Sequence, residues 1–225
     1  MSEDLLLKSH FSGEQFDQSF DRAQLPNLEL VINDNRDLSL TGDLELDNKI
    51  RVWAEARGYV RRNFVADESL LAEDEDGCKY QPLVAQAFHA LQAEAWSEGL
   101  EMKIFEGFRD HLYQRQIFMR PFVEENVEMN ESNLKGRLRW VAPPGYSKHH
   151  TGYVIDITHL QDGQRFKDSS FINTPSFAWL SADNYAKVKK FGFIPSYPAD
   201  LTNCGPNPEP WEYVYVGRQT LISML

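Results

Sequence analysis

One short segment concentrates side chains that could bind a metal ion. Residues 147–156 read Ser-Lys-His-His-Thr-Gly-Tyr-Val-Ile-Asp, so that His149 precedes a glycine turn and Asp156 lies within a β-branched run. A neutral imidazole and a carboxylate are both common ligands of divalent metals, and this spacing allows both to point into one cavity. A surface histidine and an aspartate at a strand end give the same pattern. The segment therefore indicates a metal site only if other segments support it.

A second segment supplies a carboxylate on a restricted backbone. Residues 208–217 read Pro-Glu-Pro-Trp-Glu-Tyr-Val-Tyr-Val-Gly, which places Glu209 before a rigid Pro-Trp step that leads into a strand. A carboxylate held in this way suits a general base that takes a proton from metal-activated water.

A third segment of interest contains an arginine. It reads Glu106-Gly107-Phe108-Arg109, and Gln114 lies five positions after the arginine. A guanidinium just after a strand can bind a carboxylate or polarise a carbonyl. The three segments together supply candidate metal ligands, a candidate general base and a cation for a carboxylate or carbonyl group.

The elements that position these segments follow from apolar spacing and turn residues. Strands are predicted over residues 102–108, 153–157 and 211–216. Helices are predicted over residues 82–100, 110–118 and 176–190. A further helix is predicted from Asp47, whose side chain we expect to accept a backbone N–H as the helix cap. This order favours an α+β domain whose small sheet carries the site.

Composition and charge exclude several classes of protein. The chain has 225 residues with 23 Lys+Arg against 34 Asp+Glu, a net charge of −11, and 42% hydrophobic residues, which is typical of one ordinary globular domain. The negative balance argues against a nucleic-acid partner, because phosphate binding needs a positive surface. No apolar stretch approaches the roughly 18 residues of a membrane span. No secretory leader is recognisable at the start, so localisation stays open.

The acidic stretch and the two cysteines do not indicate a functional site. The acidic stretch 68–76 lacks the spacing of a calcium loop, and we interpret it as a solvated loop. Cys78 and Cys204 are compatible with one disulfide or with two free thiols.

The three motifs together resemble those of the VanY-like D-alanyl-D-alanine carboxypeptidases, within the lysostaphin/D-Ala-D-Ala/hedgehog metallopeptidase group. That family has a Gly-Tyr/Phe-Arg step with a later Gln, then Ser-x-His-x-x-Gly-x-Ala-x-Asp, then Glu-Pro-Trp-His. This chain provides, in the same order, Gly107-Phe108-Arg109 with Gln114, Ser147-x-His149-x-x-Gly152-x-Val154-x-Asp156, and Glu209-Pro210-Trp211. The resemblance covers roughly residues 80–220.

The resemblance implies a role for each matched residue. It implies His149 and Asp156 as metal ligands and Glu209 as the catalytic base. It implies that Arg109 stabilises the carbonyl or the carboxylate of the substrate. The residues that it implies in substrate binding are Ser147, Gln114 and Trp211. The cofactor that it implies is one divalent ion, zinc by preference, with manganese as the alternative.

At one position the chain departs from the family. The third metal ligand of the family is the histidine after Glu-Pro-Trp, and Glu212 stands there in this chain. Glu212 could itself bind the metal, since glutamate is a known third ligand of catalytic zinc, and this is the interpretation we favour. Alternatively Glu212 faces away and the site is degenerate, or His150 or His159 completes it. A second carboxylate would weaken the metal as a Lewis acid and favour harder ions such as manganese.

The function implied is hydrolysis of peptidoglycan stem peptides by a D,D- or L,D-carboxypeptidase, in the periplasm or cell wall. Carboxypeptidase action is favoured over endopeptidase action, because Arg109 offers one anchor for a free terminal carboxylate. The alternative is a degenerate domain that binds wall peptides or a protein partner. We expect a monomer in which a helical N-terminal extension, residues 1–79, packs on a metallopeptidase domain, residues 80–225. The fold implied is a small, mainly antiparallel sheet flanked by helices.

Overall fold

Short helices and strands alternate along the chain, and the computed structural model describes them for residues 2–21, 31–34, 38–200 and 203–225. The helices are α1 (Glu3–Leu7), α2 (Gly13–Phe16), α3 (Leu44–Ala56), α4 (Pro82–Ser97), α5 (His111–Glu124), α6 (Glu131–Arg137), α7 (Pro175–Lys190) and α8 (Arg218–Met224). The strands are β1 (Val31–Asn33), β2 (Phe64–Ala66), β3 (Ala72–Glu73), β4 (Lys79–Tyr80), β5 (Glu101–Glu106), β6 (Val154–Gln161), β7 (Gln164–Phe166), β8 (Phe193–Pro195) and β9 (Glu212–Tyr215). The π-helical turn η1 (Asp17–Asp21) and the 3₁₀ turns η3 (Glu68–Leu70), η4 (Lys148–Thr151) and η5 (Asp168–Asn173) join them.

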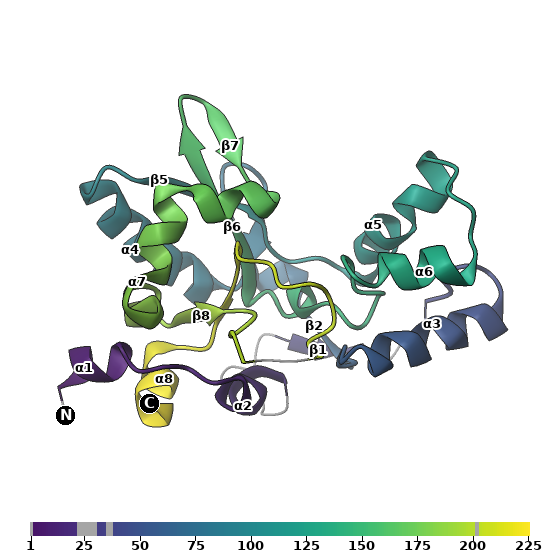
Figure 1. Ribbon diagram of the computed structural model, residues 1–225, viewed down its shortest axis with the longest axis horizontal. Coiled ribbons are helices and arrows are strands. Elements are labelled where there is room, and N and C mark those ends of the chain that lie inside the picture. Colours follow the sequence, from purple (N-terminus) through teal and green to yellow (C-terminus); the bar gives the residue numbers. More distant parts are fainter. Residues whose placement is uncertain (1, 22–30, 35–37, 201–202) are drawn as a thin grey trace.

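The central element is a five-stranded sheet in the order β5-β6-β9-β8, with β7 pairing with β6. All of its neighbouring strands are antiparallel. Strand β6 is buried from Val154 to His159, because its β-branched and apolar residues are covered on both faces. Helices α4 and α7 lie beside this sheet (Figure 1). The predicted α+β class, with a small, mainly antiparallel sheet flanked by helices, is confirmed.

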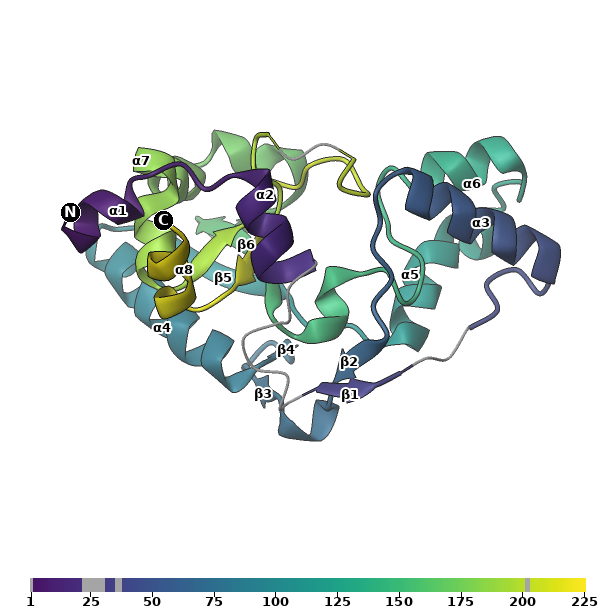
Figure 2. The ribbon, with the colours of Figure 1, turned by 90° about the horizontal axis from the view of Figure 1, so that it is seen from below.

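Two hydrophobic cores hold the elements together. The larger core surrounds the sheet and includes Phe11, Phe16 and Phe20 from the N-terminal segment. The smaller core lies among α3, α5 and α6, which group apart from the sheet in both views (Figures 1 and 2). Residues from the first 79 positions therefore contribute side chains to both cores. A domain boundary at residue 79 stays a prediction.

The predicted strands correspond to β5, β6 and β9, and the predicted helices to α3, α4, α5 and α7, with shifted ends. Helix α7 is interrupted over Ala182–Tyr185, where the backbone leaves helical dihedral angles. The sequence does not predict the ladders β1-β2 and β3-β4, because two or three paired residues leave little periodicity to read. It also does not predict α6 and α8, each of which has only seven residues.

The prediction that Asp47 caps its helix is wrong. Helix α3 starts at Leu44, and the carboxylate of Asp43 accepts the N–H groups of Glu45 and Leu46 as its cap. Asp47 lies inside the helix and is buried, and its carboxylate accepts hydrogen bonds from the preceding loop. The donors are Ser39 Oγ, Leu40 N, Thr41 N and Thr41 Oγ1, at 2.7 to 3.1 Å. Local spacing cannot distinguish these two aspartates, because the loop that reaches Asp47 is positioned by tertiary packing.

The structure shows the surroundings of the acidic stretch and the state of the two cysteines. The acidic stretch 68–76 forms η3 and β3, and its carboxylates pair with Lys79, Lys103 and Arg165 at the surface. Cys78 and Cys204 are both free thiols. Among the described helices, none combines the length and apolar character that crossing a bilayer requires.

The buried carboxylate of Asp47 generates a stability prediction. Asp47→Ala leaves the loop donors without an acceptor, and we expect the free energy of unfolding to fall by about 2–4 kcal/mol. Urea denaturation measures this loss. Glu45→Ala, an exposed carboxylate on the same helix, is the control and should leave the unfolding midpoint nearly unchanged. Equal midpoints for the two variants would contradict a structural role for Asp47.

Candidate metal centre and active site

His149 lies on a tight turn that the residues around it enforce. The Ser147 hydroxyl oxygen accepts the His149 N–H at 3.3 Å and starts turn η4, and Gly152 ends the turn at φ 69°, where glycine meets no steric penalty. The His149 ring donates from Nδ1 to the carbonyl oxygen of Gly107 at 2.7 Å. A side chain at Gly107 would force this segment to shift, because its Cβ would lie 2.3 Å from the Lys79 carbonyl oxygen. These contacts fix the ring so that Nε2 faces the sheet.

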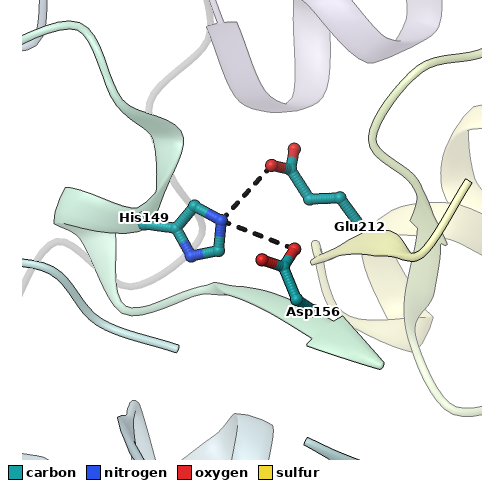
Figure 3. A group of neighbouring side chains, drawn as sticks. All are labelled: His149, Asp156 and Glu212. Atoms are coloured by element: carbon teal, nitrogen blue, oxygen red, sulfur yellow. Dashed lines mark ion pairs between the residues drawn. The ribbon is translucent and has the colours of Figure 1, made fainter. Parts of the chain in front are cut away.

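Asp156 and Glu212 meet because of strand register. Strand β6 pairs with β9 so that Asp156 lies directly opposite Glu212. Both side chains therefore project from the same face of the sheet, towards His149 (Figure 3). His149 Nε2 lies 3.6 Å from Asp156 Oδ1 and 3.3 Å from Glu212 Oε2.

These three residues fit a divalent metal ion. One donor atom from each lies within 4.8 Å of the others, and in the described part of the chain no other trio of His, Cys, Asp or Glu is grouped in this way. His149 Nε2 and Asp156 Oδ1 are buried and make no hydrogen bond with any described residue. Buried polar atoms normally have a hydrogen-bond partner, and here His149 Nε2 has only the two longer ion pairs with the carboxylates, so the convergence of these atoms fits a bound cation. The Nδ1 bond to a backbone carbonyl is also the usual support of a metal-binding histidine.

The surroundings of His149 and Glu212 shift both of their pKa values towards the charged forms. Burial and Arg109 disfavour the protonated ring of His149, but the carboxylates of Asp156 and Glu212 outweigh them and raise its pKa to about 9. Burial alone would raise the pKa of Glu212, yet Lys148, His149 and Ser196 hold that pKa well below its usual range. A metal ion entering the site would therefore meet an ionised Glu212.

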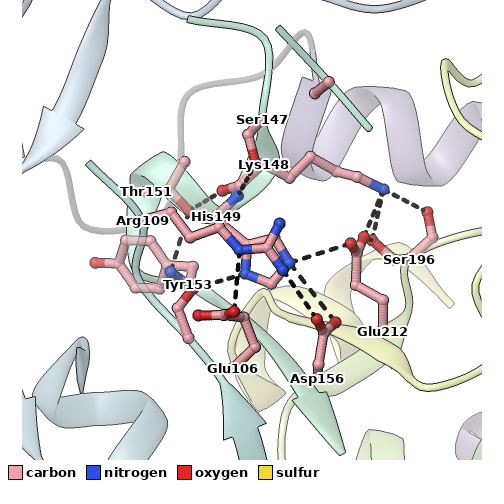
Figure 4. Close-up of polar contacts among 12 residues, drawn as sticks. Glu106, Arg109, Ser147, Lys148, His149, Thr151, Tyr153, Asp156, Ser196 and Glu212 are labelled. Carbon is pink, nitrogen blue, oxygen red and sulfur yellow. Dashed lines mark hydrogen bonds and ion pairs between the residues drawn. The ribbon is translucent and has the colours of Figure 1, made fainter. Parts of the chain in front are cut away.

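Arg109 lies against the carboxylates of the sheet. Its Nη2 donates to Asp156 Oδ2 at 3.2 Å, and its Nε lies 3.6 Å from Glu106 Oε2 (Figure 4). Asp156 thus has one oxygen held by Arg109 and the other directed at His149. In this arrangement Arg109 orients the Asp156 carboxylate, and it also lines the cleft beside it.

Most of the other predicted site residues line the same cleft. Glu209, Ser147 and Gln114 all contribute to its wall. Burial together with the carboxylates of Glu212 and Asp156 raises the pKa of Glu209 well above its usual value. A carboxylate with a raised pKa is a stronger base in its ionised form.

Gln114 and Trp211 differ in what they offer to a ligand. The Gln114 side chain is buried and donates to the Ala142 carbonyl oxygen at 2.8 Å, while its Oε1 makes no hydrogen bond with a described residue. Trp211 packs against the larger core and is not among the residues that line this cleft. Substrate binding by either residue stays a prediction.

The two histidines considered as substitute ligands are engaged elsewhere. His150 donates from Nδ1 to the Arg109 carbonyl oxygen at 2.6 Å and accepts the Gly145 N–H at Nε2. Burial, and then the neighbouring His111, lower the pKa of His150 well below its usual value. The Nδ1 atom of His159 lies 2.7 Å from Ser176 Oγ, and neither histidine belongs to the trio. The geometry leaves Glu212 as the third candidate ligand.

Two polar residues next to the trio were not predicted from the sequence. The Lys148 Nζ atom lies 3.0 Å from Glu212 Oε1 and donates to Ser196 Oγ at 2.6 Å, and Ser196 Oγ donates to the same Glu212 oxygen (Figure 4). The signals available were the position of Lys148 beside His149 and that of Ser196 in the Ser-Tyr-Pro step before Glu209. The contact with Ser196 joins residues 48 positions apart, and no local pattern reports it.

Comparison with known proteins agrees with the geometry. The family model of VanY, described as D-alanyl-D-alanine carboxypeptidase, matches residues 78–218, which is more than half of the chain. The chain therefore belongs to the VanY family. A D-alanyl-D-alanine carboxypeptidase of Enterococcus faecalis is 30% identical over 142 residues, which cover 62% of this chain and 47% of that protein. The match thus spans about half the length of this relative.

Solved structures show the same fold. VanYB, in complex with D-alanine-D-alanine, has a TM-score of 0.55 and is 27% identical, covering 68% of this chain and 81% of that one. A mutant of the vancomycin-resistance D,D-pentapeptidase VanY, in complex with Zn(II), has a TM-score of 0.54 and is 25% identical, covering 68% and 82%.

The contacts of His150 generate a prediction that separates it from the trio. His150→Ala removes two buried hydrogen bonds, and we expect the free energy of unfolding to fall by about 2–4 kcal/mol while metal binding is kept. Urea denaturation and metal titration of the same sample measure both. His89→Ala, an exposed histidine of α4, should alter neither quantity. Loss of metal binding from folded His150→Ala would restore His150 as a ligand.

Proposed function

We propose that this chain is a metal-dependent carboxypeptidase that removes a terminal D-amino acid from peptidoglycan stem peptides. The observation that carries the proposal is the convergence of His149 Nε2, Asp156 Oδ1 and Glu212 Oε2, two of them buried without a hydrogen bond, beside the cleft that Glu209 lines. Membership of the VanY family supports the reaction class. Relatives in complex with D-alanine-D-alanine and with Zn(II) support the type of substrate and zinc as the first choice of ion.

The proposed ligands of the ion are His149, Asp156 and Glu212. When bound, a divalent ion supplies a Lewis acid that polarises the scissile carbonyl and acidifies water. Two carboxylates and one imidazole form a harder donor set than two imidazoles and one carboxylate, so manganese remains the alternative ion.

Glu209 is proposed as the group that moves protons. Its carboxylate would accept a proton from the attacking water and return it to the amine that leaves. Its raised pKa supports this role, because burial and the two nearby carboxylates favour the protonated form during the reaction. Its place after Asn207 and Pro208, on a loop that hydrogen-bonds to Arg139, keeps it at the cleft.

Arg109 and Gln114 are proposed to hold the substrate. The Arg109 guanidinium has donors that can bind the terminal carboxylate or the carbonyl oxygen of the peptide. The unsatisfied Gln114 Oε1 can accept a peptide N–H, since it is buried in the cleft wall with no competing donor among the described residues. A free carboxylate at the anchor favours removal of the last residue over cleavage within a cross-link.

The role of Glu209 is testable with a conservative substitution. Glu209→Gln keeps the size of the side chain but removes its basicity, and we expect the rate of D-alanine release from a pentapeptide ending in D-Ala-D-Ala to fall by about 10²–10⁴-fold. Glu131→Gln, on the surface of α6, is the matched control. A tetrapeptide ending in one D-alanine, assayed in parallel, separates D,D- from L,D-carboxypeptidase action. Activity kept by Glu209→Gln would exclude Glu209 as the base.

Metal content tests the ligand set independently of activity. Protein purified without chelator should hold about one divalent ion per chain, and mass spectrometry distinguishes zinc from manganese. Glu212→Ala should lose the ion, because two ligands are too few for a stable site. Glu75→Ala, in the acidic stretch, should keep it. Metal-free wild-type protein that still binds stem peptides would instead support a non-catalytic binding domain.

A further inference from the structure

The carboxylate of Glu212 is held by the ammonium group of Lys148 and the hydroxyl group of Ser196. Lys148, only 9% exposed, directs its ammonium group at Glu212 Oε1 from 3.0 Å. The same ammonium donates to the hydroxyl and carbonyl oxygens of Ser196, which is fully buried. The Ser196 hydroxyl then donates to Glu212 Oε1, so both groups act on one carboxylate oxygen.

Neighbouring side chains hold Lys148 in this position. Its Nζ atom lies 3.7 Å from the centre of the Tyr197 ring and 5.3 Å from that of Phe16. The face of each aromatic ring attracts a cation. Phe16 belongs to the N-terminal helix α2. A buried ammonium is costly without such partners, so Lys148 is fixed by Glu212, Ser196 and two aromatic rings together.

The consequence for Glu212 is that its two oxygens are no longer equivalent. Oε1 is occupied by Lys148 and Ser196, whereas Oε2 faces His149 Nε2 at 3.3 Å. A carboxylate fixed in this way offers a metal ion one oxygen, which matches the single donor atom that an imidazole would provide. The partner ammonium also offsets the charge that the second carboxylate adds to the site.

We propose that Lys148, assisted by Ser196, is the positioning residue that makes Glu212 a one-oxygen metal ligand, so that Lys148 and Glu212 form a matched pair. This inference rests on the proposed metal site. It goes beyond that site by naming the residues that position its third ligand. An imidazole at position 212 has no negative charge for Lys148, which would then lie unpaired beside a metal dication. The pair should therefore be replaceable only as a unit.

A double-mutant cycle measured by zinc affinity tests the pairing. The proteins are wild type, Lys148→Met, Glu212→His and the double variant, with zinc titrated against a chelating indicator. We expect each single variant to bind zinc about 10–100-fold more weakly, which is typical when support of a ligand is lost. The double variant should recover to within a few-fold of wild type, because a neutral thioether beside an imidazole removes the unpaired charge. Such non-additivity is the signature of residues that act together.

Two controls separate positioning from a general loss of structure. Lys189→Met removes another buried lysine, which donates to backbone carbonyls of the N-terminal segment, and it should leave zinc affinity unchanged. Ser196→Ala is a milder change that should weaken zinc binding in the Glu212 protein but not in the Glu212→His background. Thermal unfolding of each metal-free protein shows whether it is folded.

The outcomes are distinct. Weaker zinc binding in both single variants, together with recovered zinc binding in the double variant, supports the matched pair. Additive losses, or unchanged zinc affinity in Lys148→Met, overturn it while wild-type zinc binding keeps the proposed function intact. Tighter binding by Lys148→Met also overturns it, because removal of a cation then acts through charge alone. Wild-type protein that binds no zinc or manganese overturns both the pairing and the metal-dependent function.

Discussion

The antiparallel pairing of β6 with β9 is the constraint on which the site depends. It places Asp156 opposite Glu212, and successive residues of a strand face opposite sides of the sheet. A slip of one residue would turn Glu212 into the opposite face and leave His149 with one carboxylate. The paired strands are held inside the protein, because Val154, Ile155 and Val214 are fully buried and belong to the core that surrounds the sheet. Packing of the hydrophobic core thus sets the positions of Asp156 and Glu212, although burial of their charges is itself unfavourable.

Charge balance is the second constraint. Asp156 and Glu212 are almost completely buried, and buried carboxylates are tolerated only when they are paired and hydrogen-bonded. Each has one oxygen paired with a cation, Asp156 with Arg109 and Glu212 with Lys148, and one oxygen directed at His149. Because each carboxylate has its own cation, the repulsion between the two acidic side chains is offset. It also fixes which oxygens remain for a ligand.

Parts of the chain outside the matched family segment help to shape the cleft. Tyr59 and Arg62 contribute to its wall. The loop before Glu209 hydrogen-bonds to the end of the α3 region, since Gly205 N donates to the Arg57 carbonyl oxygen at 2.9 Å. Phe16 lies against Lys148. The N-terminal segment therefore contributes to the surroundings of both Glu209 and Glu212, as well as to the two cores.

The sequence by itself determined the features that local physics controls. The turn between Ser147 and Gly152 and the main strands and helices could be predicted from residue type and spacing, because turns and periodicity depend on neighbours in the chain. The family was indicated by the resemblance of three ordered motifs. Local sequence left open whether Glu212 faces His149 and Asp156, and it indicated the wrong aspartate as the cap of α3. Only the tertiary structure decided these points. The register of β6 and β9 directs Glu212 inward, and the contacts of Lys148 with Ser196 and of Asp47 with its loop join segments whose approach is set by packing of the cores.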